Sequence, residues 1–175
     1  MNVATIKKRD IANGVGVRVS LFVSGCTHHC KGCFNREAWD FSYGTPYTEE
    51  TENALLALLA PEYIDGLSLL GGEPFEPQNQ RVLIGLLRRF KEAFPSKTVW
   101  CYTGYTLESD LLSESRARCE VTDEMLSHID VLIDGEFVEE LRNIRLLFRR
   151  TFLDGKLARG YATAHKIVHV FKRIA

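Results

Sequence analysis

Val17-Arg18-Val19-Ser20-Leu21-Phe22-Val23-Ser24-Gly25-Cys26-Thr27-His28-His29-Cys30-Lys31-Gly32-Cys33 is the stretch that decides the fold. Its first seven residues are mostly β-branched or apolar, which is typical of a buried strand. Ser24-Gly25 ends that run, and three cysteines follow within eight positions. This pattern predicts a strand that enters a cysteine-rich loop at one edge of a sheet.

Three more short apolar runs end in glycine or polar residues. We expect strands at residues 66–70, 98–102 and 130–133, which run into Gly71-Gly72-Glu73, Thr103-Gly104 and Asp134-Gly135. We expect helices at residues 49–59, with Thr48 as N-cap, and at 81–94, 108–112 and 123–128. Strands that alternate with helices favour an α/β fold with a mainly parallel sheet. The carboxyl ends of parallel strands share one edge, so the four strand ends predict a single site.

Length and composition indicate one globular domain over residues 1–175, with 45% hydrophobic and 26% charged residues. No apolar stretch approaches the roughly 18–20 residues that span a bilayer. The first 15 residues contain no apolar signal core. We therefore expect a cytoplasmic protein with no membrane contact.

The charge of the chain is uneven although its net value is −1. Residues 142–175 contain nine Lys or Arg and one acid, whereas the preceding 141 residues contain 13 basic and 22 acidic residues. This basic C-terminal segment is interpreted either as a solvated surface or as a docking surface for an acidic partner protein. Nucleic acid is not expected as a partner, because the segment contains no nucleic-acid motif.

The three clustered cysteines, Cys26, Cys30 and Cys33, are candidate metal ligands. Thiolates are the ligands that iron–sulfur clusters require, and three of them on one loop can hold three corners of a cubane. The fourth iron would then remain open to bind a small molecule. Cys101 and Cys119 stand apart, and no disulfide framework is indicated.

A structural zinc site is the alternative for this loop. Such a site normally has four Cys or His ligands, and His28 or His29 could supply the fourth. Adjacent-residue geometry inside so small a loop is poor, and the second Cys-x-x-Cys pair of a zinc ribbon is absent. The loop by itself does not decide between an iron–sulfur cluster and a zinc site.

The spacing Cys-x3-Cys-x2-Cys after a first strand, with Gly71-Gly72-Glu73-Pro74 after a second, resembles the radical S-adenosylmethionine superfamily. The resemblance implies a small partial (β/α) barrel with a [4Fe–4S] cluster on the three cysteines. It implies that Gly71 and Gly72 approach the methionine moiety of S-adenosylmethionine and that Glu73 accepts from its α-ammonium group. An ordinary turn is the alternative for the Gly-Gly-Glu-Pro segment.

Further segments narrow the resemblance to the activating proteins of anaerobic (class III) ribonucleotide reductases. They are Asp10 to Arg18, Leu21 to Cys26, Cys33-Phe34-Asn35-Arg36 with Trp39, Gly71 to Phe75 with Pro77-Gln78-Asn79, Trp100 to Tyr105, and Asp130 to Phe137. Gly32 stands where the superfamily often has an aromatic residue before the third cysteine. The family's Arg-Gly-Ser-x-Asn-Gln-Arg stretch is missing after Arg149, so residues 142–175 diverge from the family.

The resemblance implies that the reduced cluster cleaves S-adenosylmethionine and that the resulting radical takes a hydrogen atom from a glycine of the reductase. The implied partners are the large subunit of the reductase and an electron donor such as flavodoxin, with a homodimer of this chain within the complex. Gly32 and Phe34 are expected near the adenine or the cluster, with a core role as the alternative for Phe34. Thr103 is expected at S-adenosylmethionine or in a plain turn, and no side chain is expected to be catalytic beyond the cluster and cofactor.

Two competing functions remain. One is activation of another glycyl-radical enzyme of the pyruvate formate-lyase type, against which Gly32 and the short chain argue. The other is a non-catalytic iron–sulfur module for electron transfer or structure.

Overall fold

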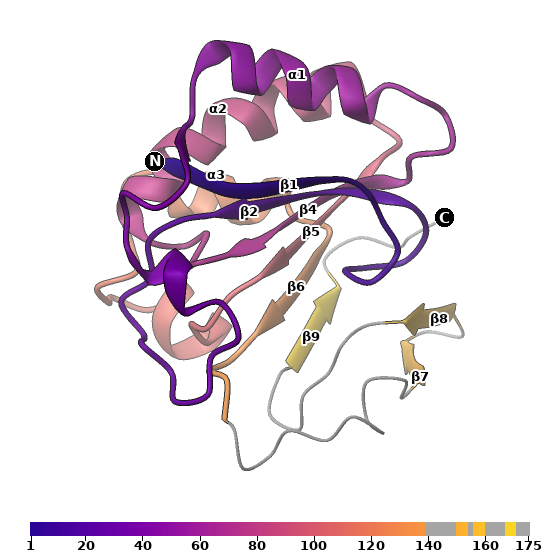
Figure 1. The fold of residues 1–175 in the computed structure, drawn as a ribbon. Helices are drawn as coiled ribbons and strands as arrows, with labels where there is room; N and C mark the ends of the chain where they lie inside the picture. Colours follow the sequence, from indigo (N-terminus) through magenta and orange to yellow (C-terminus); the bar gives the residue numbers. More distant parts are fainter. Residues whose placement is uncertain (139–149, 154–155, 160–166, 171–175) are drawn as a thin grey trace.

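The computed structural model describes residues 1–138, 150–153, 156–159 and 167–170. They form a seven-stranded mixed sheet in the order β3-β1-β2-β4-β5-β6-β9 and a separate two-stranded sheet, β7-β8 (Figure 1). The strands are β1 (Asn2–Asp10), β2 (Arg18–Val23), β3 (Thr45–Pro46), β4 (Gly66–Gly71), β5 (Thr98–Tyr102), β6 (Val131–Asp134), β7 (Arg150–Leu153), β8 (Lys156–Arg159) and β9 (Ile167–Val170). The helices are α1 (Glu49–Leu59), α2 (Pro77–Ala93) and α3 (Thr122–His128), with a 3-10 helix at Arg36–Trp39 and a π-helix at Leu107–Leu111.

The four central strands confirm the expected α/β class with a mostly parallel sheet. β2 pairs with β4, β4 with β5 and β5 with β6, all in parallel. β1 and β9 add antiparallel strands at the two sides. β1 was not predicted from the sequence, because only Val3 and Asp10 of that strand are buried and its remaining residues show no apolar period.

The helices α1, α2 and α3 cover one face of the sheet (Figure 1). The start of α1 is as predicted: the Thr48 hydroxyl accepts from the Thr51 amide at 3.3 Å and forms a capping box. The start of α2 was predicted four residues too late, because Pro77 occupies the first helical position, where its missing N–H costs nothing. The helix expected at residues 108–112 is a π-helix at Leu107–Leu111.

Arg18 secures the edge of the sheet opposite to the strand ends discussed below. It is the first residue of β2 and is 1% exposed. Its guanidinium donates to the carbonyl oxygens of Leu67 in β4 and Thr98 in β5. Burial lowers the pKa of Arg18 to about 10, so the group stays charged at neutral pH. The starts of three parallel strands are thereby tied together, which fixes the register that places their carboxyl ends.

The basic C-terminal segment, residues 142–175, lies largely outside the described residues. Within it the structure gives the backbone of β7, β8 and β9. Among the helices of the described ranges, none is both long and apolar enough to cross a membrane.

Candidate metal centre

The carboxyl ends of β2, β4, β5 and β6 meet at one edge of the sheet, as predicted. The Gly72 amide after β4 donates to the Val23 carbonyl at the end of β2, at 2.7 Å. The Glu73 amide donates to the Gly25 carbonyl at 2.8 Å, and the Gly135 amide donates to the Tyr105 carbonyl at 2.9 Å. The cysteine loop therefore lies directly against the ends of the neighbouring strands.

Gly71 and Gly72 are required by this close backbone contact. Gly71 has φ +116°, and a Cβ there would lie 2.5 Å from the Val23 nitrogen. A Cβ on Gly72 would lie 2.5 Å from the Gly25 carbonyl oxygen and 2.7 Å from that of Ala38. The structure thus gives a packing reason for both glycines, and their contact with S-adenosylmethionine stays a prediction.

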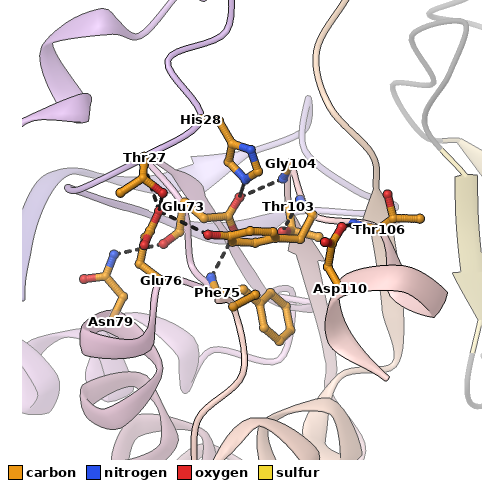
Figure 2. A network of polar contacts seen from close by, with 12 residues as sticks. Thr27, His28, Glu73, Phe75, Glu76, Asn79, Thr103, Gly104, Thr106 and Asp110 are labelled. Carbon is orange, nitrogen blue, oxygen red and sulfur yellow. Dashed lines mark hydrogen bonds and ion pairs between the residues drawn. The ribbon is translucent and has the colours of Figure 1, made fainter. Parts of the chain in front are cut away.

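Glu73 is a buried hub, 1% exposed (Figure 2). Its Oε1 accepts from the Phe75 amide at 2.9 Å and from the Thr103 hydroxyl at 2.7 Å. Its Oε2 accepts from the Gly104 amide at 2.7 Å. His28 Nε2 lies 3.3 Å from the same Oε2, at ion-pair distance but outside hydrogen-bond geometry. The carboxylate of Glu73 therefore joins the ends of β4 and β5 and faces the cysteine loop.

The Thr103 hydroxyl forms hydrogen bonds within this edge of the sheet. Thr103 is 2% exposed, its hydroxyl donates to Glu73, and the same oxygen accepts from the Tyr105 amide at 3.0 Å. These bonds give Thr103 the turn role that was one of its two alternatives. Its contact with S-adenosylmethionine stays a prediction.

The two histidines of the loop pack against aromatic rings. The His28 ring lies 4.3 Å from the Tyr105 ring, and a Cβ on Gly104 would lie 2.9 Å from the imidazole. The His29 ring lies 4.7 Å from the Trp39 ring, and His29 has φ +52°, a left-handed conformation that histidine tolerates better than most residues. Both imidazoles thus help to shape the loop.

A second carboxylate, that of Glu76, binds the cysteine loop at Thr27 and was not predicted from the sequence. Its Oε1 accepts from both the amide (2.8 Å) and the hydroxyl (2.6 Å) of Thr27 (Figure 2). Asn79 assists by donating from Nδ2 to the carbonyl oxygens of Ser24 and Glu73 at 3.0 and 2.9 Å. The available signal was the pair of acids three residues apart, with the second at a helix start, but their direction depends on the folded loop.

The three candidate ligands lie on one loop but in different surroundings. Cys26 is 8% exposed, whereas Cys30 and Cys33 are partly exposed. The Cys33 amide donates to the Cys30 carbonyl at 3.2 Å, and Gly32, with φ +73°, occupies the third position of that turn, as type II turns require.

Burial changes the acidity of two of these thiols. It raises the pKa of Cys26 to about 12. It also raises the pKa of Cys30, an effect that a hydrogen bond from the Phe137 backbone partly offsets. Both thiols are therefore protonated at neutral pH in the metal-free chain, and metal binding would release their protons.

The loop supplies three thiols, whereas a structural zinc site normally has four Cys or His ligands. Within the described part of the chain, no three His, Cys, Asp or Glu side chains converge to hold one metal ion, and this includes the three loop cysteines. Cys101 is buried in β5, and Cys119 lies beside Thr122, whose Oγ1 is 3.8 Å from the sulfur. The loop therefore offers three thiols, which suits a cubane with one iron left without a protein ligand.

Comparison with known proteins agrees with this assignment. A family model described as a 4Fe-4S single cluster domain matches residues 12–153. The anaerobic ribonucleoside-triphosphate reductase-activating protein of Haemophilus influenzae is 38% identical over 174 residues, 98% of this chain and 99% of the relative. Proteins of the same name are 41% identical in Pasteurella multocida (85% of this chain, 92% of the relative) and 39% identical in Escherichia coli K12 (80% and 87%). The chain belongs to this family.

Family membership puts the cysteine loop and the three neighbouring strand ends inside the matched iron–sulfur domain. Phe34 lies beside Cys33 and is 82% exposed, so the alternative that it is a core residue was wrong. Contact of Gly32 and Phe34 with a cofactor stays a prediction, and so does the ligand role of each cysteine.

Proposed function

We propose that this chain generates the glycyl radical of an anaerobic ribonucleotide reductase by reductive cleavage of S-adenosylmethionine at a [4Fe–4S] cluster. The observation that carries the proposal is the three-thiol loop, held against the glycine-rich end of β4 in a chain that matches an iron–sulfur domain. The names of its relatives supply the reductase as the protein acted upon. The fold that we propose for the chain is the partial (β/α) barrel of the radical S-adenosylmethionine superfamily.

Cys26, Cys30 and Cys33 would hold three irons of the cluster. When bound and reduced, the cluster supplies the electron that splits S-adenosylmethionine into methionine and a 5′-deoxyadenosyl radical, which takes a hydrogen atom from the glycine. The chain's own residues would bind the cluster and S-adenosylmethionine and orient them. Glu73 fixes the ends of β4 and β5 through its bonds to the Thr103 hydroxyl and the Gly104 amide, and the family resemblance implies that its carboxylate accepts from the α-ammonium group.

The proposed partners follow from the same reaction. The large subunit of the reductase brings the glycine to the open cluster edge, near the exposed Phe34 and the partly exposed Gly32. An electron donor such as flavodoxin reduces the cluster, and a homodimer of this chain acts within the complex. The proposed compartment is the cytoplasm.

Anaerobic reconstitution tests the proposal. We expect the reduced wild-type chain to release methionine and 5′-deoxyadenosine from S-adenosylmethionine. Cys26→Ala, Cys30→Ala and Cys33→Ala should each abolish both products, whereas Cys119→Ala, the matched control, should keep them. Absence of products from a wild-type chain with a complete cluster would instead indicate a non-catalytic iron–sulfur module.

A further inference from the structure

Glu76 begins α2 but does not cap it with its side chain. Asp, Asn, Ser or Thr at this position usually accepts from the first free amides of the helix. The Glu76 carboxylate makes no such bond. The helix start is held instead by the backbone, because the Glu76 carbonyl accepts from the amides of Asn79 and Gln80 at 2.8 and 3.0 Å. The side chain, in a residue only 5% exposed, is thus free to serve the neighbouring loop.

The carboxylate reaches Thr27, which lies 49 residues earlier in the chain. A single oxygen, Oε1, accepts from the Thr27 amide and the Thr27 hydroxyl, and the Tyr105 hydroxyl lies 3.5 Å from it. Hydrogen bonds to an ionised acceptor are roughly twice as strong as neutral ones. The bonded amide belongs to the peptide group that joins Cys26 to Thr27. Its orientation therefore depends on Glu76.

We propose that Glu76 is a positioning residue for the iron–sulfur cluster, which sets the direction of Cys26 through Thr27. The inference rests on the proposed function, since it concerns the same cluster. None of the described hydrogen bonds to the Glu76 carboxylate comes from a cysteine, so Glu76 acts through the backbone of the loop. Its removal should leave α2 formed while the first part of the loop becomes mobile.

Hydrogen–deuterium exchange of the metal-free chain measures the hydrogen bond between the Thr27 amide and Glu76. Glu76→Ala should speed exchange of the Thr27 amide by about tenfold, the loss expected for a charge-assisted hydrogen bond. Glu76→Gln keeps an acceptor oxygen and should restore part of the protection. Glu92→Ala, on an exposed acid of the same helix, is the matched control and should leave Thr27 unchanged.

Electron paramagnetic resonance and redox titration of the reconstituted chain measure the effect on the cluster. Glu76→Ala should change the spectrum and midpoint potential of the reduced cluster, with Glu76→Gln closer to wild type. A lower melting temperature with an unchanged spectrum and potential would overturn the positioning role and leave the proposed function intact. A wild-type chain that holds no [4Fe–4S] cluster would overturn both the positioning role and the proposed function. This outcome is distinct from the first, because it is seen in the wild-type chain before any substitution is made.

Discussion

The two halves of the cysteine loop differ in how they are held. Residues 24–28, the first half, are fastened by Glu73, Glu76 and Asn79 and contain the buried Cys26. Residues 29–35, the second half, contain the partly exposed Cys30 and Cys33 and the exposed Phe34. Among the described contacts, the second half is held by its own turn, by the His29–Trp39 ring contact and by the end of β6.

The difference indicates that the two halves of the cysteine loop have different roles. The first half fixes one candidate ligand, Cys26, against the sheet, where burial and charge-assisted bonds resist movement. The second half leaves two candidate ligands partly exposed and an aromatic ring at the surface, where a partner chain can approach. A cluster that must be rigidly held yet reach a protein substrate needs both properties.

Thiol labelling of the metal-free chain should show the largest contrast between the halves. With a pKa of about 12, the Cys26 thiol is protonated at pH 8, and burial also shields it. Alkylation of Cys26 should be on the order of a thousandfold slower in the folded than in the unfolded chain, and should speed up as pH rises toward 12. Cys33, which is more exposed, should be labelled first. Mass spectrometry with timed quenching gives both rates, and equal rates for Cys26 and Cys33 would remove the distinction.

Glu73→Ala should give the next largest effect. The substitution leaves the Phe75 and Gly104 amides and the Thr103 hydroxyl without their buried acceptor. The free energy of unfolding should fall by about 3–5 kcal/mol. Denaturant titration measures it, with Glu92→Ala as a control that should change stability by less than about 0.5 kcal/mol. A loss no greater than the control's would show that the first half does not depend on this hub.

Gly72→Ala should be less damaging but still destabilising. The new Cβ would meet the carbonyl oxygens of Gly25 and Ala38, which belong to backbone and cannot move aside cheaply. We expect a loss of about 1–3 kcal/mol in thermal or denaturant unfolding. Gly85→Ala is the matched control: it lies within α2, its Cβ would meet nothing closer than 4.0 Å, and it should be stabilising by up to about 1 kcal/mol. Equal results at the two positions would contradict the tight contact between the loops.

Phe34→Ala should have the smallest effect on folding. The ring is 82% exposed, so the free energy of unfolding should change by less than about 0.5 kcal/mol. Its proposed place at the cofactor or partner edge predicts reduced radical transfer from a stable protein. A variant with normal stability and normal transfer would leave Phe34 without a role, and a clearly destabilised variant would contradict its exposure.

The sequence predicted the site's edge well because strand ends in a parallel sheet are placed by topology. Cys26, Gly71 and Thr103 each follow an apolar run, and pairing those runs in parallel was enough to bring them together. The bounds of α1 were predicted because Thr48 and the leucines of that helix mark its start and its buried side.

Two features could not be predicted from the sequence: the directions of side chains, and a strand that is mostly polar. Glu76 could have capped α2, and only the folded loop shows that its carboxylate turns to Thr27 instead. Glu73 was expected to face a ligand, yet three of its bonds go to the chain itself. β1 was missed because a largely polar strand with few buried residues lacks the apolar alternation that marks a strand.

The most direct test of the central claim is the glycyl radical itself. The reconstituted chain, S-adenosylmethionine and a reductant would be mixed anaerobically with purified anaerobic ribonucleotide reductase, and separately with a pyruvate formate-lyase-type enzyme. Electron paramagnetic resonance should then show a glycyl radical on the reductase, and none when Cys26→Ala replaces the wild-type chain. A complete cluster that produces no radical on the reductase, or produces one on the other enzyme alone, would contradict the account.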